Sequence, residues 1–286
     1  MTDTAAARVA VYLDFDNIVI SRYDQVHGRS SYQKDKASGL KRDKLAASTV
    51  DVGAIIDFAS SFGTLVLTRA YADWSTDMNA DYRGQLVARA VDLVQLFPAA
   101  AYGKNGADIR LAVDTVEDMF RLPDLTHVVI VAGDSDYIAL AQRCKRLGRY
   151  VVGIGVAGSS SRALASACDE FVIYDALPGV PALDPDPTPA RKAAPKREAR
   201  RDADEEPDPQ DAATALLSRA LQIGLEKDDA EWLHNSAVKA QMKRMDPSFS
   251  EKSLGYRSFS DFLRARARDD VVELDESSTT RLVRLK

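Results

Sequence analysis

Aspartates stand directly after two short apolar runs of this 286-residue chain, and others lie on a helical pattern between them. Asp14 and Asp16 follow the first run, where the period-two alternation of a strand would put both on one side. Asp134 and Asp136 follow the other run and precede a helix, whose first amides and dipole favour carboxylates. Asp108 stands near the start of the intervening helix. Because open α/β sheets bind ligands beyond the carboxyl ends of their strands, these acids are candidates for a single site.

Several carboxylates in one place need positive charge nearby. Unpaired carboxylates raise one another's pKa at a cost in free energy, whereas hard divalent cations such as Mg²⁺ or Mn²⁺ prefer oxygen ligands and remove that cost. Two such ions roughly 3.5–4 Å apart can hold a phosphodiester, activate a water molecule and stabilise the leaving oxygen. The pattern therefore indicates metal-dependent transfer of a phosphoryl group to water. For any single aspartate, the alternative is a helix cap or a turn.

The first 180 residues alternate short β-branched runs with helical patterns. Strands that are apolar on both faces and separated by helices indicate a parallel sheet covered on both sides. We predict a three-layer α/β domain with a central parallel sheet. The expected strands are Arg8–Asp14, Gly63–Ala70, Thr126–Ala132, Tyr150–Val156 and Glu170–Tyr174, and the expected helices lie near 51–61, 80–96, 106–121, 136–147 and 161–167.

Composition excludes several classes of protein. Hydrophobic residues make up 45% of the chain and charged residues 28%, which excludes wholesale disorder and fibrous repeats. A net charge of −5 argues against a protein that coats nucleic acid by charge alone, but not against a nucleic-acid enzyme. Two cysteines and three scattered histidines provide neither a disulfide framework nor a zinc site. No secretory signal or membrane span is recognisable, so we expect a cytoplasmic protein without a membrane partner.

Eight of the eleven prolines lie between Pro178 and Pro209, around a charged stretch that is almost free of apolar residues. Such a segment cannot bury enough surface to offset its ordering entropy, so we expect residues 178–210 to be a disordered linker. The chain would then divide into a first domain at 1–177 and a second at 211–286. The second combines helical stretches with two short terminal strands, which predicts a small winged-helix-like domain.

Three segments of the first domain resemble the NYN-domain family, the PIN-like ribonucleases that include LabA-like bacterial proteins. They are LDFDN at the end of the first strand, KNGADIRLAVD on a helix, and VVIVAGDSDYIALAQRCKRLGRYVVGIG, in the family's order within residues 8–175. The resemblance implies a PIN-like fold and a metal-dependent endoribonuclease. In such an enzyme, a metal-activated water hydrolyses RNA phosphodiesters, with Mg²⁺ or Mn²⁺ as the cofactor.

The same resemblance implies roles for individual residues. Lys104 is a candidate phosphate contact. On an ideal helix Asp114 points about 240° away from Asp108, so we rank Asp114 below the other acids. The implied metal-binding and catalytic acids are Asp14, Asp108, Asp134 and Asp136, and the implied supporting residues are Asp16, Asn17, Asp114 and Ser135.

The segment Ser21–Val50 is longer than an ordinary connection and rich in Lys, Arg and Tyr. Long loops beside active sites can close over substrate, and basic residues with interleaved aromatics suit single-stranded RNA. Arg22 and Tyr23, together with Arg29 and Tyr32, are therefore candidate RNA contacts. A disordered insertion is the equal alternative.

The second domain resembles the OST-HTH/LOTUS domain through the segment DPSFSEKSLGYRSFSDFL. This resemblance spans 211–286 and implies a winged-helix-like fold that binds RNA or, in some members, a protein partner. Lys252 and Arg257 are candidate contacts to an RNA backbone, and solvated surface charge is the alternative for each. We therefore expect RNA, single-stranded or structured, as the partner, with a protein partner possible at the second domain. The sequence does not indicate the oligomeric state.

Two other functions stay open at this point. A haloacid-dehalogenase-type phosphatase would use Asp14 as a covalent nucleophile and Asp16 as a general acid. Against it, Ile18 and Ile138 stand where that family has other residue types, and Asp108 has no role. A non-catalytic PIN-like scaffold would bind RNA or protein without cleaving it, and the intact acids argue against this function.

Overall fold

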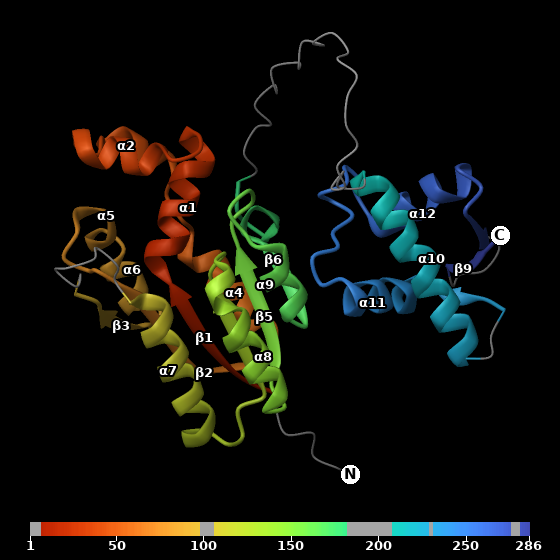
Figure 1. Ribbon diagram of the computed structural model, residues 1–286, viewed down its shortest axis with the longest axis horizontal. Coiled ribbons are helices and arrows are strands. Elements are labelled where there is room, and N and C mark those ends of the chain that lie inside the picture. Colours follow the sequence, from red (N-terminus) through yellow and green to blue (C-terminus); the bar gives the residue numbers. More distant parts are fainter. Residues whose placement is uncertain (1–6, 98–105, 182–207, 229–230, 276–280) are drawn as a thin grey trace, which may run out of the picture. The chain divides into compact units, whose positions relative to one another are not determined.

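The chain forms two compact units, Met1–Ala182 and Leu183–Lys286, which are described separately. The computed structural model describes residues 7–97, 106–181, 208–228, 231–275 and 281–286 (Figure 1). Most of the predicted linker lies outside these ranges, so its extent stays a prediction. Among the helices within them, none is both long and apolar enough to span a membrane.

A six-stranded parallel sheet forms the centre of the first unit, which confirms the predicted α/β fold. The strands are β1 Arg8–Asp14, β2 Thr64–Ala72, β3 Asp92–Gln95, β4 His127–Val131, β5 Tyr150–Gly155 and β6 Glu170–Ile173. They follow the order β3-β2-β1-β4-β5-β6, so β1 and β4 are central neighbours. Leu13 pairs with Val131, and both strands therefore end at the same edge of the sheet.

Helices cover both faces of this sheet. The helices are α1 Phe15–His27, α2 Ser31–Ser38, α3 Arg42–Ala47, α4 Val52–Ser60, α5 Asp77–Ala80, α6 Arg83–Ala88, α7 Ala107–Arg121, α8 Ile138–Arg146 and α9 Arg162–Ala167, with short 3₁₀ turns η1 Ser135–Tyr137 and η2 Tyr174–Ala176. Alternate residues of β1 divide between two cores. Val9, Val11 and Leu13 pack with α1 and α4, whereas Ala10 and Tyr12 pack with α7, α8 and α9. The three layers are visible in Figure 1.

The charged segment 21–50 is helical, because α1 continues to His27 and α2 and α3 follow it. Two half-buried acids order it. Asp24 accepts two backbone N–H groups at the start of α2. Asp35 accepts hydrogen bonds from the Tyr23 hydroxyl at 2.7 Å and from the Lys44 Nζ at 2.6 Å. The alternative of a disordered insertion is therefore wrong.

The predicted helix at 80–96 is wrong in its second half. α6 ends at Ala88, and Ala90 has a positive φ of 55°. The next residues form the edge strand β3, in which Leu93 pairs with Ala70 of β2. The apolar spacing around Val91 suits a helix as well as a strand, and pairing with β2 decides between them.

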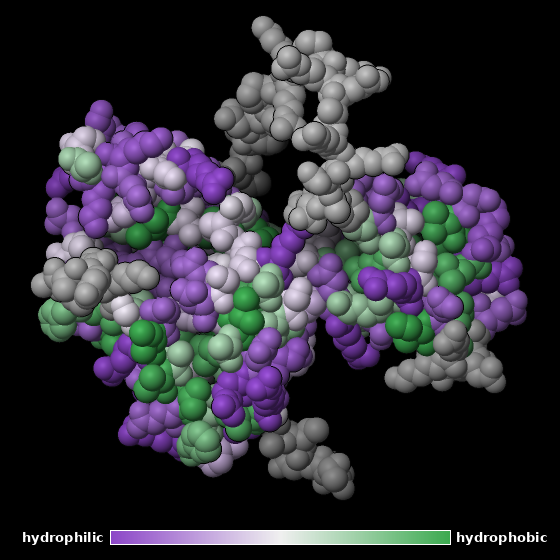
Figure 2. Space-filling view, in the orientation of Figure 1, coloured by the Kyte–Doolittle hydropathy of each residue, from purple (hydrophilic) through white to green (hydrophobic). Residues whose placement is uncertain are grey.

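The orientation of α7 depends on buried polar contacts as well as on apolar ones. Leu111 and Met119 pack into the core below the helix. Directly before Met119, Asp118 accepts a hydrogen bond from the Tyr12 hydroxyl at 3.1 Å and pairs with Arg69 at 2.5 Å. The exposed apolar residues on the outer side of α7, where green atoms gather in Figure 2, are Ile109, Val113 and Phe120. The buried acid therefore helps to fix which face of α7 meets the sheet.

The second unit packs helices against a three-stranded antiparallel sheet of order β7-β9-β8. Its elements are α10 Pro209–Asp228, β7 Leu233–His234, α11 Asn235–Met245, α12 Phe259–Arg268, β8 Val272–Asp275 and β9 Leu282–Leu285. The Ser258 hydroxyl caps α12 by accepting the N–H of Asp261 at 3.2 Å. The buried Phe262 ring contacts Phe249 and Phe259 at centroid distances of 5.6 and 5.8 Å. The predicted helices and terminal strands are thus present around an aromatic core.

Candidate functional site

Asp14 is both the last residue of β1 and the N-cap of α1. The residue is only 6% exposed. Its Oδ1 accepts the N–H of Asn17 at 3.2 Å, and its Oδ2 accepts the hydroxyl of Tyr137 at 2.6 Å. Burial raises the pKa of Asp14 to about 7, and the charges of Asp16 and Asp134 add to the rise, although the two hydrogen bonds oppose it. The site therefore contains a buried carboxylate whose charge is not balanced by its hydrogen bonds.

Asn17 joins the ends of β1 and β4. Its Nδ2 donates to Oδ2 of Asp134 at 2.5 Å, and its Oδ1 accepts the N–H of Gly133 at 3.0 Å. These two partners fix the orientation of the amide, because a carboxylate can only accept and a backbone N–H can only donate. A single side chain in the first turn of α1 thus holds the acidic end of β4 next to that of β1.

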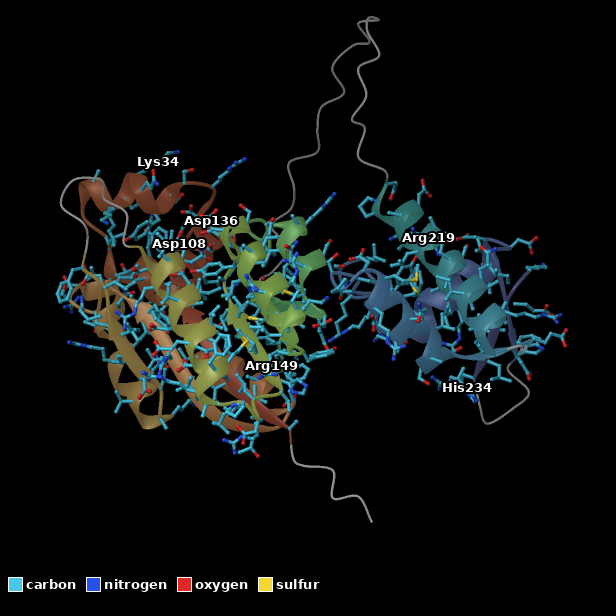
Figure 3. The ribbon with its side chains drawn as sticks, turned by 60° about the horizontal axis from the view of Figure 1, so that its bottom comes forward. Lys34, Asp108, Asp136, Arg149, Arg219 and His234 are labelled. Carbon is cyan, nitrogen blue, oxygen red and sulfur yellow. The ribbon has the colours of Figure 1, made fainter. Side chains whose placement is uncertain are left out.

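Asp134, Asp136 and Asp108 share one electrostatic environment. Partial burial raises the pKa of Asp134, and the charges of Asp136 and Asp108 raise it further. Asp108 lies in the first turn of α7, three residues before the buried Leu111 and on the same helix face. Figure 3 shows Asp108 and Asp136 at the same end of the first unit. Asp134 is therefore within electrostatic range of each of the other three predicted metal ligands, Asp14, Asp108 and Asp136.

No Lys, Arg or His side chain in the described ranges forms an ion pair with any of these four acids. Their oxygens do not form a complete cation shell either, because no group of three or more His, Cys, Asp or Glu side chains there is arranged to hold a metal ion. The donors are carboxylate oxygens alone, without thiol or imidazole, and this is the chemistry that Mg²⁺ and Mn²⁺ favour. The chemical type of the donors therefore suits a hard divalent cation, although their side chains are not arranged around one point.

Asp16 does not lie in a strand, as the predicted alternation of side chains would require. The chain is helical from Phe15 onward, so the expectation that Asp14 and Asp16 share one side of a strand is wrong. Asp16 instead accepts the N–H of Asp73 at 3.3 Å and the Nδ2 of Asn79 at 2.6 Å. These contacts attach the start of α1 to the loop after β2.

That loop contributes polar residues that sequence analysis missed. Asp73 is 9% exposed and accepts the Ser75 hydroxyl at 2.5 Å, which lowers its pKa. Asn79 is fully buried, and its Oδ1 has no hydrogen-bond partner among the described residues. Asp73 could have been found by the signal that identified Asp14, because each acid follows one of two neighbouring parallel strands.

The supporting residues lie in different places. Asp114 faces β2, where it accepts the Tyr71 hydroxyl at 3.1 Å and the Arg110 Nε at 2.9 Å, in keeping with its lower rank. Ser135 is exposed and begins η1 directly after Asp134. Lys104 lies outside the described residues.

The interpretation of Arg22 and Tyr23 as RNA contacts needs correction. Arg22 is 5% exposed, forms an ion pair with Asp175 and lies over the ring of Tyr174. Tyr23 is fully buried and donates its hydroxyl to Asp35. Both side chains hold α1 against its neighbours, so neither reaches solvent to meet a ligand.

Two known domain families match the two units of the chain. The NYN domain matches residues 8–175, which is more than half of the chain. The chain belongs to the NYN domain family. The OST-HTH/LOTUS domain matches residues 207–284 of this NYN protein and points to RNA or protein binding by the second unit. Both family resemblances of the sequence are thereby confirmed.

Two individual proteins are similar to this NYN protein. An uncharacterized protein of Methanocaldococcus jannaschii is 27% identical over 123 residues, which are 43% of this chain and 47% of that relative. The chain thus spans about half the length of this curated relative. A crystal structure of a protein of unknown function from Vibrio parahaemolyticus is 22% identical to this chain, with a TM-score of 0.41. The matched region covers 60% of this chain and 96% of the Vibrio chain.

The raised pKa of Asp14 predicts a pH-dependent stability in EDTA. The folded-state pKa of about 7 exceeds the ordinary value of 3.8. The contribution of Asp14 to the free energy of unfolding is therefore fully present below about pH 4 and is lost as the pH rises to about 7. One pKa unit is about 1.4 kcal/mol, and 1 kcal/mol moves Tm by roughly 2–4 °C in a domain of this size. We expect Asp14→Asn to reduce the fall in Tm between pH 5 and pH 8 by several degrees, measured by differential scanning calorimetry.

A matched control is Asp57→Asn, which removes an exposed carboxylate paired with Arg89 on the outer side of α4. It should keep the wild-type dependence of Tm on pH. An equal dependence in Asp14→Asn and wild type would show that Asp14 titrates normally in the folded protein.

Proposed function

We propose that the NYN domain is a metal-dependent endoribonuclease. The observation that carries the proposal is the convergence of acids at the adjoining ends of β1 and β4, with no described cationic side chain paired to them. Asp14, Asp108, Asp134 and Asp136 would hold Mg²⁺ or Mn²⁺. When bound, such an ion supplies the positive charge that binds a scissile phosphate and makes a water molecule more acidic.

Neighbouring side chains keep these acids in place. Asn17 holds the Asp134 carboxylate next to β1 through its hydrogen bond of 2.5 Å. Tyr137 donates to Asp14, and its own pKa is raised by burial and by the charge of Asp14, so its hydroxyl stays protonated. Hydrolysis then requires a water in line with the leaving oxygen and no side-chain nucleophile. We expect Asn17 and Tyr137 to act as positioning residues.

The family match leaves the phosphatase alternative without support, because an NYN domain accounts for Asp108 as well as for the acids after β1 and β4. The non-catalytic scaffold predicts a different experimental result. It would bind RNA with the same affinity whether or not these acids are present, and it would leave the RNA intact.

Cleavage of labelled RNA in Mn²⁺ or Mg²⁺ tests the nuclease. We expect the wild-type protein to cleave single-stranded or structured RNA internally, and EDTA to abolish this cleavage. Asn17→Ala should slow cleavage by about 10- to 100-fold, as substitutions that disturb the orientation of metal ligands do. Asp14→Asn and Asp134→Asn should reduce the rate further, because each removes a ligand charge.

Asp57→Asn serves again as the control and should cleave RNA at the wild-type rate. A DNA strand of the same sequence measures the preference for RNA. Intact RNA that nevertheless binds the wild-type protein would contradict the nuclease and favour the scaffold. Hydrolysis of p-nitrophenyl phosphate with intact RNA would favour the phosphatase.

For the second domain, we propose that the turn before α12 contacts the RNA backbone. Lys252 and Arg257 are both exposed in this turn. Lys239 is engaged elsewhere, since it pairs with Glu251 at 2.5 Å and lies over the ring of Phe259. The two exposed cations are therefore the basic side chains of this turn that can meet phosphate.

The double variant Lys252→Gln/Arg257→Gln tests this contact in the full chain with EDTA. Loss of two phosphate contacts should lower the slope of log affinity against log salt by about 1.4 for single-stranded RNA, at roughly 0.7 per contact. A control that removes two exposed cations elsewhere in the domain is Arg219→Gln/Arg268→Gln. Equal slopes for the two double variants would refute the RNA contact and favour a protein partner.

A further inference from the structure

A cavity of about 500 Å³ lies in the first unit, outside the acidic site. Its volume is in the range of pockets that bind small ligands, roughly 300–1,000 Å³. The walls come from α1, from α3 in the 21–50 segment, and from α5 and α6 with the residues between them. The lining residues that matter here are Val19, Arg42, Leu45, Met78, Asp81 and Gln85.

This cavity begins about one helical turn from Asp16, which stands two residues after Asp14. Val19 follows Asp16 by three residues on α1, a rise of roughly 4.5 Å along the axis. On the opposite wall, Met78 directly precedes Asn79, whose Nδ2 donates to Asp16 at 2.6 Å. The cavity therefore lies beside the start of α1 and the loop after β2, which Asp16 joins.

Two opposite charges line the cavity. Arg42 on α3 and Asp81 between α5 and α6 are both exposed. Neither forms an ion pair, with each other or with any other residue in the described ranges. A well-matched ligand must offer acceptors to the guanidinium of Arg42 and donors to the carboxylate of Asp81. It must also present an apolar surface to Val19, Leu45 and Met78.

We propose that the cavity binds a guanine base of the RNA, an inference that rests on the proposed nuclease function. Guanine presents O6 and N7 as acceptors, the pair that arginine recognises in a bidentate manner. Its N1–H and N2–H are two donors on one edge and match an acceptor-only carboxylate, whereas adenine, cytosine and uracil each present one donor group there. The flat ring suits Met78, since thioethers pack well against aromatic systems. Unstacked bases of single-stranded RNA are recognised by such edge contacts.

Mononucleotide binding to the full chain in EDTA tests the proposal by isothermal titration calorimetry. GMP has no internal phosphodiester and no divalent ion is present, so the result does not depend on nuclease activity. We expect GMP to bind at least tenfold more tightly than AMP, CMP and UMP, a difference of about 1.4 kcal/mol. Asp81→Asn and Arg42→Gln should each remove most of this preference.

Two further variants separate the cavity from general charge effects. Ala46→Phe adds an aromatic ring to the lining and should abolish GMP binding without changing the charge. Arg83→Gln removes an exposed cation of α6 that does not line the cavity and should bind GMP like wild type. If Ala46→Phe lowers Tm, the effect of Asp81→Asn on the GMP preference decides whether the cavity is a guanine site. The carboxylate of Asp81 is exposed and forms no ion pair in the described ranges, so this substitution removes no such contact from the fold.

Equal affinity for the four nucleotides, or an unchanged preference in Asp81→Asn, would overturn the guanine site. A GMP preference in a protein that leaves RNA intact with Mn²⁺ would support the cavity and refute the nuclease. Cleavage of RNA without any base preference in binding would refute the cavity alone.

Discussion

The buried negative charge of Asp14 is the constraint on which the site depends. A buried carboxylate costs free energy unless positive charge or strong hydrogen bonds compensate it. Here Tyr137 and Asn17 supply hydrogen bonds, but Asp134 adds a second negative charge close by. The parallel pairing of β1 with β4 brings these acids together, because both strands end at the same edge of the sheet. In the proposed function, a cation bound there would lower the free energy of the folded protein.

Other parts of the domain hold this arrangement in place. Asn17 joins the two strand ends, and the pairing of Asp118 with Tyr12 and Arg69 fixes the face that α7 turns to the sheet. Asp108 lies at the beginning of that helix, so its position follows from contacts made farther along it. The helix α3 of residues 21–50 forms one wall of the cavity, and Val19 of α1 forms another part of its lining. The proposed metal site and the proposed base site would thus both include residues at or on α1.

The strands and the acids that follow them could be predicted from the sequence, because a buried parallel strand is a continuous apolar run and its end is marked by the first polar residues. The direction of Asp16 could not, since it depends on α1 beginning at once after β1. Nor could the burial of Arg22, whose partner Asp175 is 153 residues away in the chain. Asp73 carries the same signal as Asp14, because it directly follows β2, the parallel neighbour of β1.

The most direct test of the account is a calorimetric titration of the full chain with Mn²⁺ in the absence of RNA. If the acids at the ends of β1 and β4 form a cation site, wild type and Asp57→Asn bind Mn²⁺ with the same Kd. Asp14→Asn and Asp134→Asn then bind it at least tenfold more weakly, a loss of about 1.4 kcal/mol. Absence of Mn²⁺ binding by wild type, or an unchanged Kd in both site variants, would contradict the account.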